Sequence, residues 1–340
     1  MKSTAASEAK QKKGFTPLRA ALTGLAAFCA LILLFTLLTP LPASYMIRLA
    51  FREGPAVPPD GYKEMQKQVL AAKDLTYPSA YKDNTADIFT PKEGGLFPVV
   101  LWVHGGGFAG GDKRDIEIYA TALAAEGFGV VCINYRRAPE AKYPTPLLQT
   151  GEAIVWLGAV AGEYSLDTNR LVLAGDSAGA HIAAQFAAIQ SNPAYAEETG
   201  ITPTVSMDKL KALLLFCGPY DASEISNISS PFLGFMLGKA AQAYFGMGNW
   251  EKRLAGQADI GRHVTETFPP AFISDSNTNS FESHGKALAQ ILKDKQVPVE
   301  EYFIPMETEV TSHEYQFVMN TPAGRKSFQK TVSFLQEHTK

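Results

Sequence analysis

The sequence contains little that would indicate a metal centre, a disulfide framework or a nucleic-acid partner. Only three cysteines occur among 340 residues, and none has the spacing of metal ligands. Cys132 and Cys217 lie in apolar runs of strand length, which predicts buried, unpaired thiols. The net charge is -3 and no basic stripe is interleaved with aromatic residues, so nucleic acid is not expected to bind. No metal or organic cofactor is expected.

A long uncharged run near the N-terminus predicts a transmembrane segment. Residues 20–38 carry no charge, and a helix over them would rise about 28 Å, close to the ~30 Å hydrocarbon core of a bilayer. The alternative is a cleaved signal peptide, but the apolar region of such peptides usually spans roughly 7–15 residues, and Leu41-Pro-Ala43 is a poor cleavage site. The sequence favours an uncleaved signal anchor.

The charges around this run predict its orientation. Residues 1–19 form a polar tail whose cationic side chains are Lys2, Lys10, Lys12, Lys13 and Arg19. Only Arg48 and Arg52 follow the run closely, so the positive-inside rule places the N-terminus in the cytoplasm. The rest of the chain would then lie on the periplasmic, extracellular or lumenal side, in a membrane-bound, single-pass protein.

From residue 83 to the C-terminus, strand-like and helix-like segments alternate. Strands are predicted over residues 97–103, 128–135, 170–174, 212–217, 271–274 and 299–304, and helices over 116–125, 147–160, 178–190, 283–294 and 325–337. This alternation is typical of a mostly parallel α/β sheet with helices on both faces. Residues 44–82 are mixed in character, and they form either a linker from the anchor or part of a cap.

Gly175-Asp-Ser-Ala-Gly179 follows the predicted strand 170–174 and precedes a helical pattern. Glycines on both sides of Ser177 allow a tight strand-to-helix turn that exposes the hydroxyl, the arrangement of a nucleophile elbow. The pattern alone is also compatible with an ordinary turn whose serine caps the helix. The flanking strand and helix favour the nucleophile.

His104-Gly-Gly-Gly107 follows directly on the predicted strand 97–103. Consecutive glycines allow backbone N–H groups to point at a developing oxyanion, and the spacing of a phosphate-binding loop is missing. Gly105 and Gly106 from this loop, together with Ala178 from the elbow, are therefore predicted to form the oxyanion hole.

The order of these motifs, with Asn134-Tyr-Arg-Arg-Ala-Pro-Glu140 between them and a late histidine, resembles the hormone-sensitive-lipase-like α/β-hydrolases, the group of bacterial esterases and arylacetamide deacetylases. The resemblance covers residues 84–337. It implies the α/β-hydrolase fold and a serine esterase, with a cap built from the N-terminal stretch and from an insertion over residues 222–262. His313, in a loop before the final helix, matches the position of the family's general base.

The third member of the expected triad departs from this family. The resemblance implies an aspartate where Asn279 stands. An amide can orient an imidazole but supplies no charge to the imidazolium, and the change from aspartate to asparagine costs about 10⁴-fold in the serine-protease example. We therefore hold two alternatives: Asn279 orients His313 directly, or the nearby carboxylate of Asp275 replaces the missing acid. Asp275 can also be read as a residue that only caps a loop.

The resemblance implies hydrolysis of carboxylic esters with short to medium acyl chains, through Ser177 and His313 and without a cofactor. A deacetylase or amidase would use the same groups. The alternative from another class is a small-molecule-binding protein with a disabled triad, which Asn279 favours and the intact Ser177 and His313 oppose. A purely structural membrane protein would leave the motifs unexplained. The oligomeric state is not predicted.

Overall fold

The computed structural model describes residues 17–52, 54–246 and 256–340. The lysines of the predicted tail and residues 247–255 of the predicted cap insertion lie outside these ranges. The strands are β1 Val69–Thr76, β2 Thr85–Pro91, β3 Phe97–Val103, β4 Gly129–Ile133, β5 Leu166–Asp176, β6 Leu210–Phe216, β7 Ala271–Asp275 and β8 Val299–Phe303.

The helices are α1 Pro17–Leu38, α2 Leu41–Ala50, α3 Tyr62–Lys67, α4 Glu117–Ala125, α5 Thr145–Val160, α6 Ala178–Ser191, α7 Pro193–Thr199, α8 Pro231–Phe245, α9 Glu282–Asp294 and α10 Pro322–His338. Short 3₁₀ helices are η1 Lys113–Ile116, η2 Ala161–Tyr164, η3 Ala222–Glu224, η5 Ile260–Arg262 and η6 Tyr315–Phe317.

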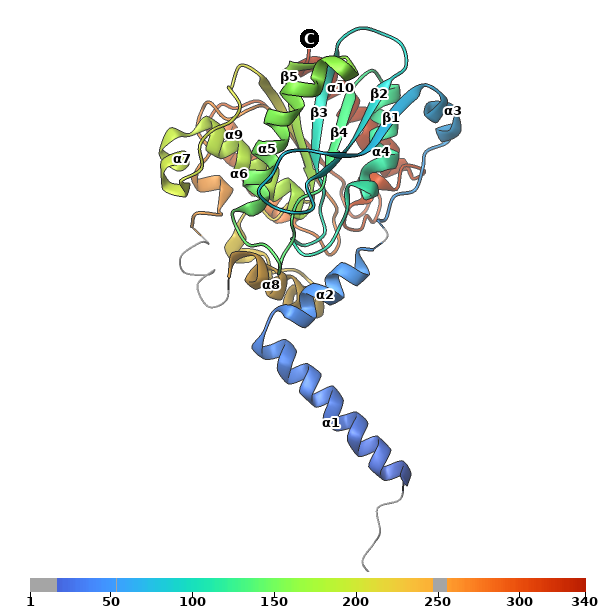
Figure 1. The fold of residues 1–340 in the computed structure, drawn as a ribbon, viewed down its shortest axis with the longest axis vertical. Coiled ribbons are helices and arrows are strands. Elements are labelled where there is room, and N and C mark those ends of the chain that lie inside the picture. Colours follow the sequence, from blue (N-terminus) through green and yellow to red (C-terminus); the bar gives the residue numbers. More distant parts are fainter. Residues whose placement is uncertain (1–16, 53, 247–255) are drawn as a thin grey trace, which may run out of the picture.

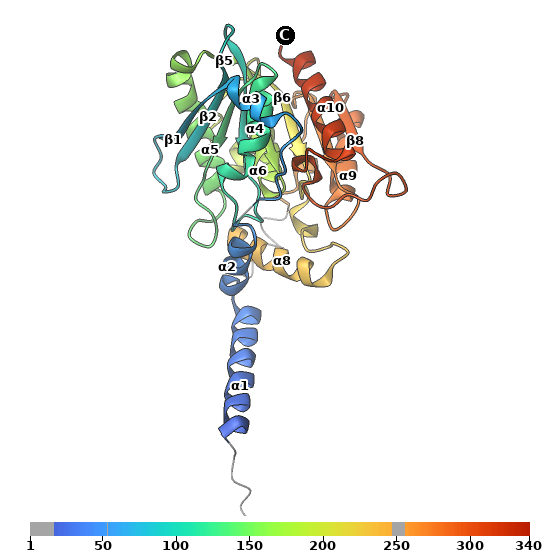
Figure 2. The same cartoon turned by 90° about the vertical axis from the view of Figure 1, so that its right-hand side faces the viewer.

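The eight strands form one sheet in the order β1-β2-β4-β3-β5-β6-β7-β8. From β4 to β8 all neighbours are parallel, whereas β2 pairs antiparallel with both β1 and β4. Side chains alternate across the sheet: Val99 and Leu101 of β3 join the core beneath α5 and α6, and Trp102 joins the core beneath α4 and α10. Helices therefore cover both faces (Figures 1 and 2), and the predicted parallel α/β architecture is confirmed.

The six predicted strands are all present, but β1 and β2 were not predicted. β2 is buried along most of its length although it contains Asp87, whose charge interrupts the apolar pattern. In the fold, Lys113 from η1 donates to Asp87 with an Nζ···Oδ1 distance of 2.6 Å, and both side chains are almost fully buried. The partner of a buried charge comes from a distant segment, so local periodicity does not reveal it.

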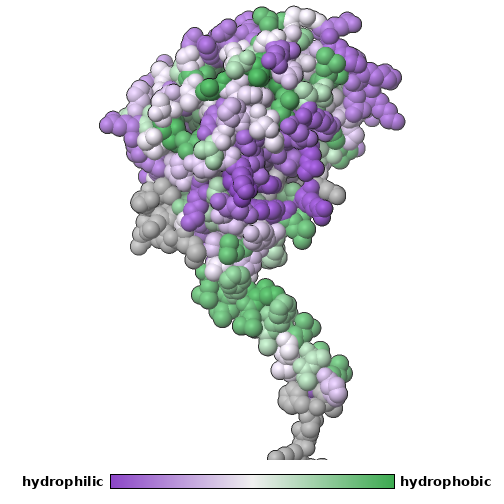
Figure 3. Space-filling view, viewed as in Figure 1, coloured by the Kyte–Doolittle hydropathy of each residue, from purple (hydrophilic) through white to green (hydrophobic). Residues whose placement is uncertain are grey.

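Helices α2 and α8 pack together over the carboxyl ends of the parallel strands, and we call this pair the cap. Ala43 and Ile47 of α2 form a buried cluster with Met236 and Ala240 of α8 and with Ala109 of the loop after β3. The stretch 44–82 therefore contributes both a cap helix and the edge strand β1. Helix α1 extends away from the body at the base of the cap (Figure 2), and its apolar side chains are exposed along its length (Figure 3).

Candidate active site

Ser177 lies at a sharp turn between β5 and α6. Its backbone has φ 51° and ψ −120°, a combination that non-glycine residues rarely adopt. The turn is held because the Ser177 N–H donates to the carbonyl of Phe216 on the adjacent strand at 2.8 Å. The strained serine at a strand-to-helix junction is the geometry of a nucleophile elbow.

The elbow and the glycine loop approach each other so closely that no side chain fits at the glycines between them. A Cβ atom on Gly179 would lie 2.0 Å from the carbonyl oxygen of Val103, and one on Gly105 would lie 2.3 Å from Oδ2 of Asp176. Both glycines are therefore required by close approach of the two loops. The sequence motifs that flank the two strands meet at one point of the sheet.

The structure brings Ser177 and His313 together. The Nε2 atom of His313 lies 2.9 Å from Oγ of Ser177, within hydrogen-bond distance for proton transfer. His313 comes from the loop between β8 and η6, and its ring packs edge-on against Phe281 at 5.8 Å between centroids. The hydroxyl and its candidate base therefore occupy the relative positions that nucleophilic catalysis requires.

The other nitrogen of His313 contacts Ser280 and not Asn279. Nδ1 of His313 lies 2.6 Å from Oγ of Ser280, and the Ser280 hydroxyl donates a short hydrogen bond to Oδ1 of Asp275. Because Nε2 accepts a hydrogen bond from Ser177, the ring proton is on Nδ1, which donates a hydrogen bond to Oγ of Ser280. Ser280 thus connects the imidazole to the carboxylate of Asp275 through one hydroxyl.

Asn279 does not make the expected contact with His313. Its backbone is left-handed, with φ 47°, and its Oδ1 atom accepts from the hydroxyl of Ser229 at 2.9 Å. Ser229 belongs to the segment that leads into α8, so Asn279 connects the site to the cap. Of the two alternatives for the third triad member, this geometry contradicts a direct contact of Asn279 with His313 and favours Asp275, which is connected to the imidazole through Ser280.

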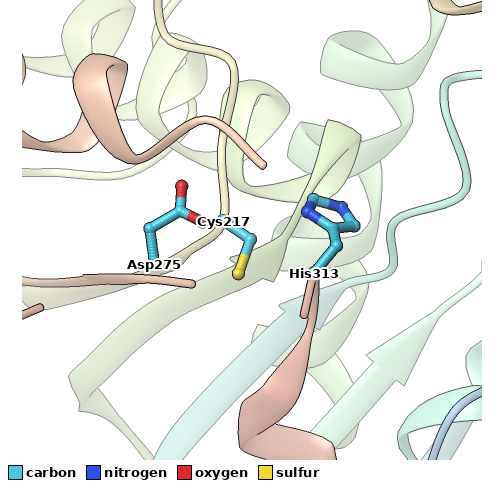
Figure 4. Close-up of side chains that lie close together, drawn as sticks. All are labelled: Cys217, Asp275 and His313. Atoms are coloured by element: carbon cyan, nitrogen blue, oxygen red, sulfur yellow. The ribbon is translucent and has the colours of Figure 1, made fainter. Parts of the chain in front are cut away.

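Cys217 follows β6 and lies beside Asp275 and His313 (Figure 4). One donor atom from each of the three residues lies within 4.8 Å of the other two, close enough to surround a metal ion. A metal there would take the imidazole or the carboxylate away from Ser280, and so would compete with the Ser177–His313 arrangement. Cys132 and Cys217 are both buried free thiols, as predicted.

The predicted oxyanion donors need one correction. The N–H of Gly105 donates to Oδ2 of Asp176 at 2.8 Å and is therefore occupied. Within the described residues, the N–H groups of Gly106 and Gly107 have no hydrogen-bond acceptor, and that of Ala178 opens α6 without an intrahelical partner. Gly106, Gly107 and Ala178 are the donors that the geometry leaves free for an oxyanion.

Burial sets the ionisation of the two titratable groups in this chain of hydrogen bonds. Desolvation lowers the pKa of His313 to about 4, so the imidazole is neutral at pH 7 and able to accept a proton. Desolvation raises the pKa of Asp275 to about 7, although hydrogen bonds from Ser280 and from the Ser276 N–H favour its ionised form. The negative charge of Asp275, which would stabilise the protonated form of His313, therefore forms close to neutral pH.

A second pair of buried carboxyl groups lies behind the glycine loop. Asp176 accepts from the indole N–H of Trp102 at 2.7 Å as well as from Gly105, and its other neighbour is the carboxyl of Glu314. Burial and the proximity of Asp176 raise the pKa of Glu314 well above its ordinary value. Glu314 therefore keeps its proton to higher pH than an ordinary glutamate, and this proton forms the hydrogen bond to Asp176.

Glu314→Gln is expected to raise thermal stability, and to raise it more at pH 8 than at pH 5. The unfolded chain loses the glutamate proton near pH 4.3, whereas the folded protein keeps it to higher pH, so wild-type stability falls as pH rises above that value. Glutamine supplies the same hydrogen bond without an ionisable proton. Melting curves at both pH values test this, and a Tm difference that is independent of pH would contradict it.

Two residues of this site were missed by sequence reasoning. Ser280 directly follows Asn279, and no spacing pattern distinguishes it from other loop serines. Gly107 was part of the glycine motif, but only the bond between Gly105 and Asp176 shows that the donors shift by one residue. In both cases the sequence indicated the correct loop, but not which of two adjacent residues in it faces the catalytic centre.

The elbow, the glycine loop and the Ser–His pair on this sheet define a hormone-sensitive-lipase-like α/β-hydrolase. The chain belongs to the family described as BD-FAE, which matches residues 86–291. The carboxylesterase NlhH of Mycobacterium tuberculosis is 30% identical over 214 residues, which cover 60% of this chain and 63% of that protein. The match thus spans less than two thirds of NlhH.

Two further comparisons support the fold. An acetyl esterase of Salmonella schwarzengrund is 24% identical over 275 residues, 74% of this chain and 80% of its own. The crystal structure of esterase B from Lactobacillus rhamnosis superposes with a TM-score of 0.72 and 19% identity, and covers 94% of this chain and 95% of that one. The predicted α/β-hydrolase fold is confirmed.

Proposed function

We propose that this protein is a serine hydrolase that cleaves carboxylic esters of short to medium acyl chains. The observation that carries the proposal is the 2.9 Å contact between Nε2 of His313 and Oγ of Ser177 at a strained elbow. The carboxylesterase and esterase relatives support the reaction class. The proposed catalytic residues are Ser177 and His313, with Ser280 and Asp275 as positioning residues.

In this mechanism, Oγ of Ser177 attacks the ester carbonyl carbon while its proton passes to Nε2 of His313. Gly106, Gly107 and Ala178 donate N–H groups to the oxyanion. The bond between the carbonyl carbon and the alkoxy oxygen then breaks, and the alcohol leaves with the proton from His313. Water gives a proton to His313, attacks the acyl-enzyme and releases the acid, and the proton returns to Ser177.

The hydrogen-bond chain through Ser280 bears on the alternative of a disabled triad. Asn279 supplies no carboxylate, but Asp275 is connected to His313 through a single hydroxyl. The arrangement therefore favours turnover over binding alone. A deacetylase or amidase remains the second candidate, because acyl transfer from an amide uses the same groups.

Purified full-length protein in detergent, assayed with p-nitrophenyl esters from acetyl to dodecanoyl and with the matching anilides, tests the proposal. We expect ester hydrolysis with the highest kcat/KM for short to medium chains, and slower cleavage of the anilides. Hydrolysis of no ester would overturn the proposed activity, and faster cleavage of anilides would favour the amidase.

We further propose that α1 is a retained membrane anchor with the N-terminus in the cytoplasm. Among the described residues, α1 alone is long and apolar enough to cross a bilayer, a property that a signal sequence shares. Cleavage at the poor signal-peptide site would cut the chain directly after Ala43. Retention is supported because Ala43 is fully buried in the cluster between α2 and α8. Cleavage there would cut through α2.

A further inference from the structure

We propose that the outer face of the cap lies in the lipid interface beside α1, and that esters dissolved in this leaflet reach Ser177 past the cap. This inference rests on the proposed esterase function and names its substrate class, membrane-dissolved esters. The face, which we call the apolar cap surface, consists of Leu41, Tyr45, Met46, Leu49, Phe232 and Phe235.

The apolar cap surface is unusual in its exposure. Leu49 of α2 and Phe232 of α8 are 69% and 68% exposed, and Tyr45 and Met46 are about half exposed. The space-filling view shows apolar side chains gathered on α1 and continuing to the base of the body (Figure 3). A contiguous exposed apolar face marks an interaction site, whereas isolated apolar residues are ordinary.

The end of α1 is fixed to the cap by a hydrogen bond. Lys239 of α8 is 9% exposed, and its ammonium donates to the carbonyl of Leu37 in the last turn of α1 at 2.7 Å. This bond satisfies a carbonyl that the helix itself leaves free, and it places a cation at the helix C-terminus. The C-terminal end of α1 is therefore linked to α8 as well as to α2, which follows it in the chain.

The length of α1 places the cap at the membrane surface. Its 22 residues rise about 33 Å, close to the ~30 Å of a bilayer core. Only Thr39 and Pro40 separate α1 from α2, so α2 begins where the helix leaves the hydrocarbon. Tyr45, with the Arg48 guanidinium 5.3 Å from its ring, has the chemistry that is enriched at the interface. A lipid leaflet is therefore the occupant that the chain itself brings to this surface.

The same helix contacts the oxyanion loop. Arg48 donates to the carbonyls of Ala109 and Ala138 at 2.9 and 2.8 Å, and it forms a bidentate ion pair with Glu140 at 2.7 and 2.9 Å. The Glu140 pKa is lowered to about 2 by this hydrogen-bonded partner. At neutral pH, an ion pair therefore holds α2 against the active-site loops.

Apolar side chains border the loop on the side of the cap. A Cβ atom on Gly107 would lie 3.5 Å from Ile47 of α2 and 3.6 Å from Leu237 of α8. One surface of the cap therefore faces the proposed oxyanion donors, and the opposite surface is the apolar cap surface. An ester whose acyl chain remains in the leaflet would need to cross only the thickness of these two helices to reach Ser177.

The test uses the full-length chain in phosphatidylcholine nanodiscs and two substrates, a water-soluble butyrate ester and a long-chain fluorogenic ester dissolved in the bilayer. The variant Met46→Ser/Leu49→Ser/Phe232→Ser removes exposed apolar groups only. Because interfacial binding scales with buried apolar area, we expect about a tenfold lower rate on the bilayer ester and a rate within about twofold on the soluble ester. The matched control, Leu70→Ser/Leu96→Ser/Val310→Ser, alters equally exposed residues elsewhere and is expected to change neither rate.

Equal effects of both variants, or equal loss on both esters, would overturn the inference. A depth measurement separates this failure from a failure of the proposed function. In nanodiscs of brominated lipid, we expect the bromine atoms to quench the fluorescence of the tryptophan introduced by Phe232→Trp. The tryptophan introduced by Leu96→Trp is expected to remain unquenched. A quenched Phe232→Trp signal without hydrolysis of either ester would support the surface and overturn the esterase. An unquenched signal with active enzyme would overturn the surface alone.

Discussion

Ser177→Ala is expected to lower kcat for ester hydrolysis by about 10⁵-fold or more, equivalent to roughly 7 kcal/mol of barrier. The substitution removes the only atom that the mechanism places in bonding distance of the carbonyl, and neither His313 nor the oxyanion donors form a covalent intermediate without it. The measurement is kcat for a butyrate ester with purified full-length protein, corrected for spontaneous hydrolysis.

Ser333→Ala is the control for this prediction. Ser333 is exposed on α10, where its hydroxyl bonds to the Gln329 carbonyl within the same helix, and its removal is expected to leave kcat unchanged. An unaltered Tm for Ser177→Ala would exclude a folding defect. If Ser177→Ala kept more than a few per cent of the wild-type rate, another nucleophile would have to be present.

Asp275→Asn is expected to lower kcat by about 10³–10⁴-fold, near the value for the acid of a serine-protease triad. The carboxylate holds the Ser280 hydroxyl as an acceptor from Nδ1 of His313, so its loss removes both the orientation and the charge. A pH profile tests the role directly. Because the pKa of Asp275 lies at about 7, the wild-type rate is expected to rise between pH 6 and pH 8 as the carboxylate ionises, and Asp275→Asn is expected to lose this rise.

Two companion variants separate Ser280 from Asn279. Ser280→Ala leaves Nδ1 without its partner and is expected to cost about 10–100-fold in kcat, with recovery in Ser280→Thr, because one positioned hydrogen bond is lost. Asn279→Asp is expected to change kcat by less than about threefold, since Asn279 bonds to Ser229 and not to His313. A large gain in Asn279→Asp would instead identify a disabled triad.

Much of the fold follows from local patterns. The strands β3 to β7 were predicted because buried parallel strands are largely apolar runs, and the main helices were predicted because their apolar residues recur at helical spacing. The edge strand β8 was also predicted, although it contains two glutamates and is only half-buried. β1 and β2 were missed since β1 is a half-exposed edge strand and β2 contains the buried charge of Asp87. The role of residues 41–50 as a cap helix depends on α8, which lies far away in the sequence.

The parts of the candidate site that belong to a sequence motif, the elbow and the glycine loop, could be predicted from the sequence. The pairing of Ser177 with His313 was expected from the resemblance to the family, whose general base matches His313 in position, and the structure places the two side chains in contact. Asp275 was one of two alternatives for the acid, but its connection to His313 through Ser280 could not be predicted. It depends on a left-handed Asn279 that turns its side chain toward Ser229 and leaves Ser280 facing the imidazole. Loop side-chain direction is set by tertiary contacts, and a motif does not record it.

The central claim, that Ser177 is a nucleophile activated by His313, is tested most directly by a fluorophosphonate. Full-length protein in detergent is labelled at pH 8, digested and analysed by mass spectrometry to locate the adduct. We predict rapid labelling on the peptide that contains Ser177, loss of the adduct in Ser177→Ala, and strongly slowed labelling in His313→Ala. An adduct on another residue, or no labelling of the wild-type protein, would contradict the account.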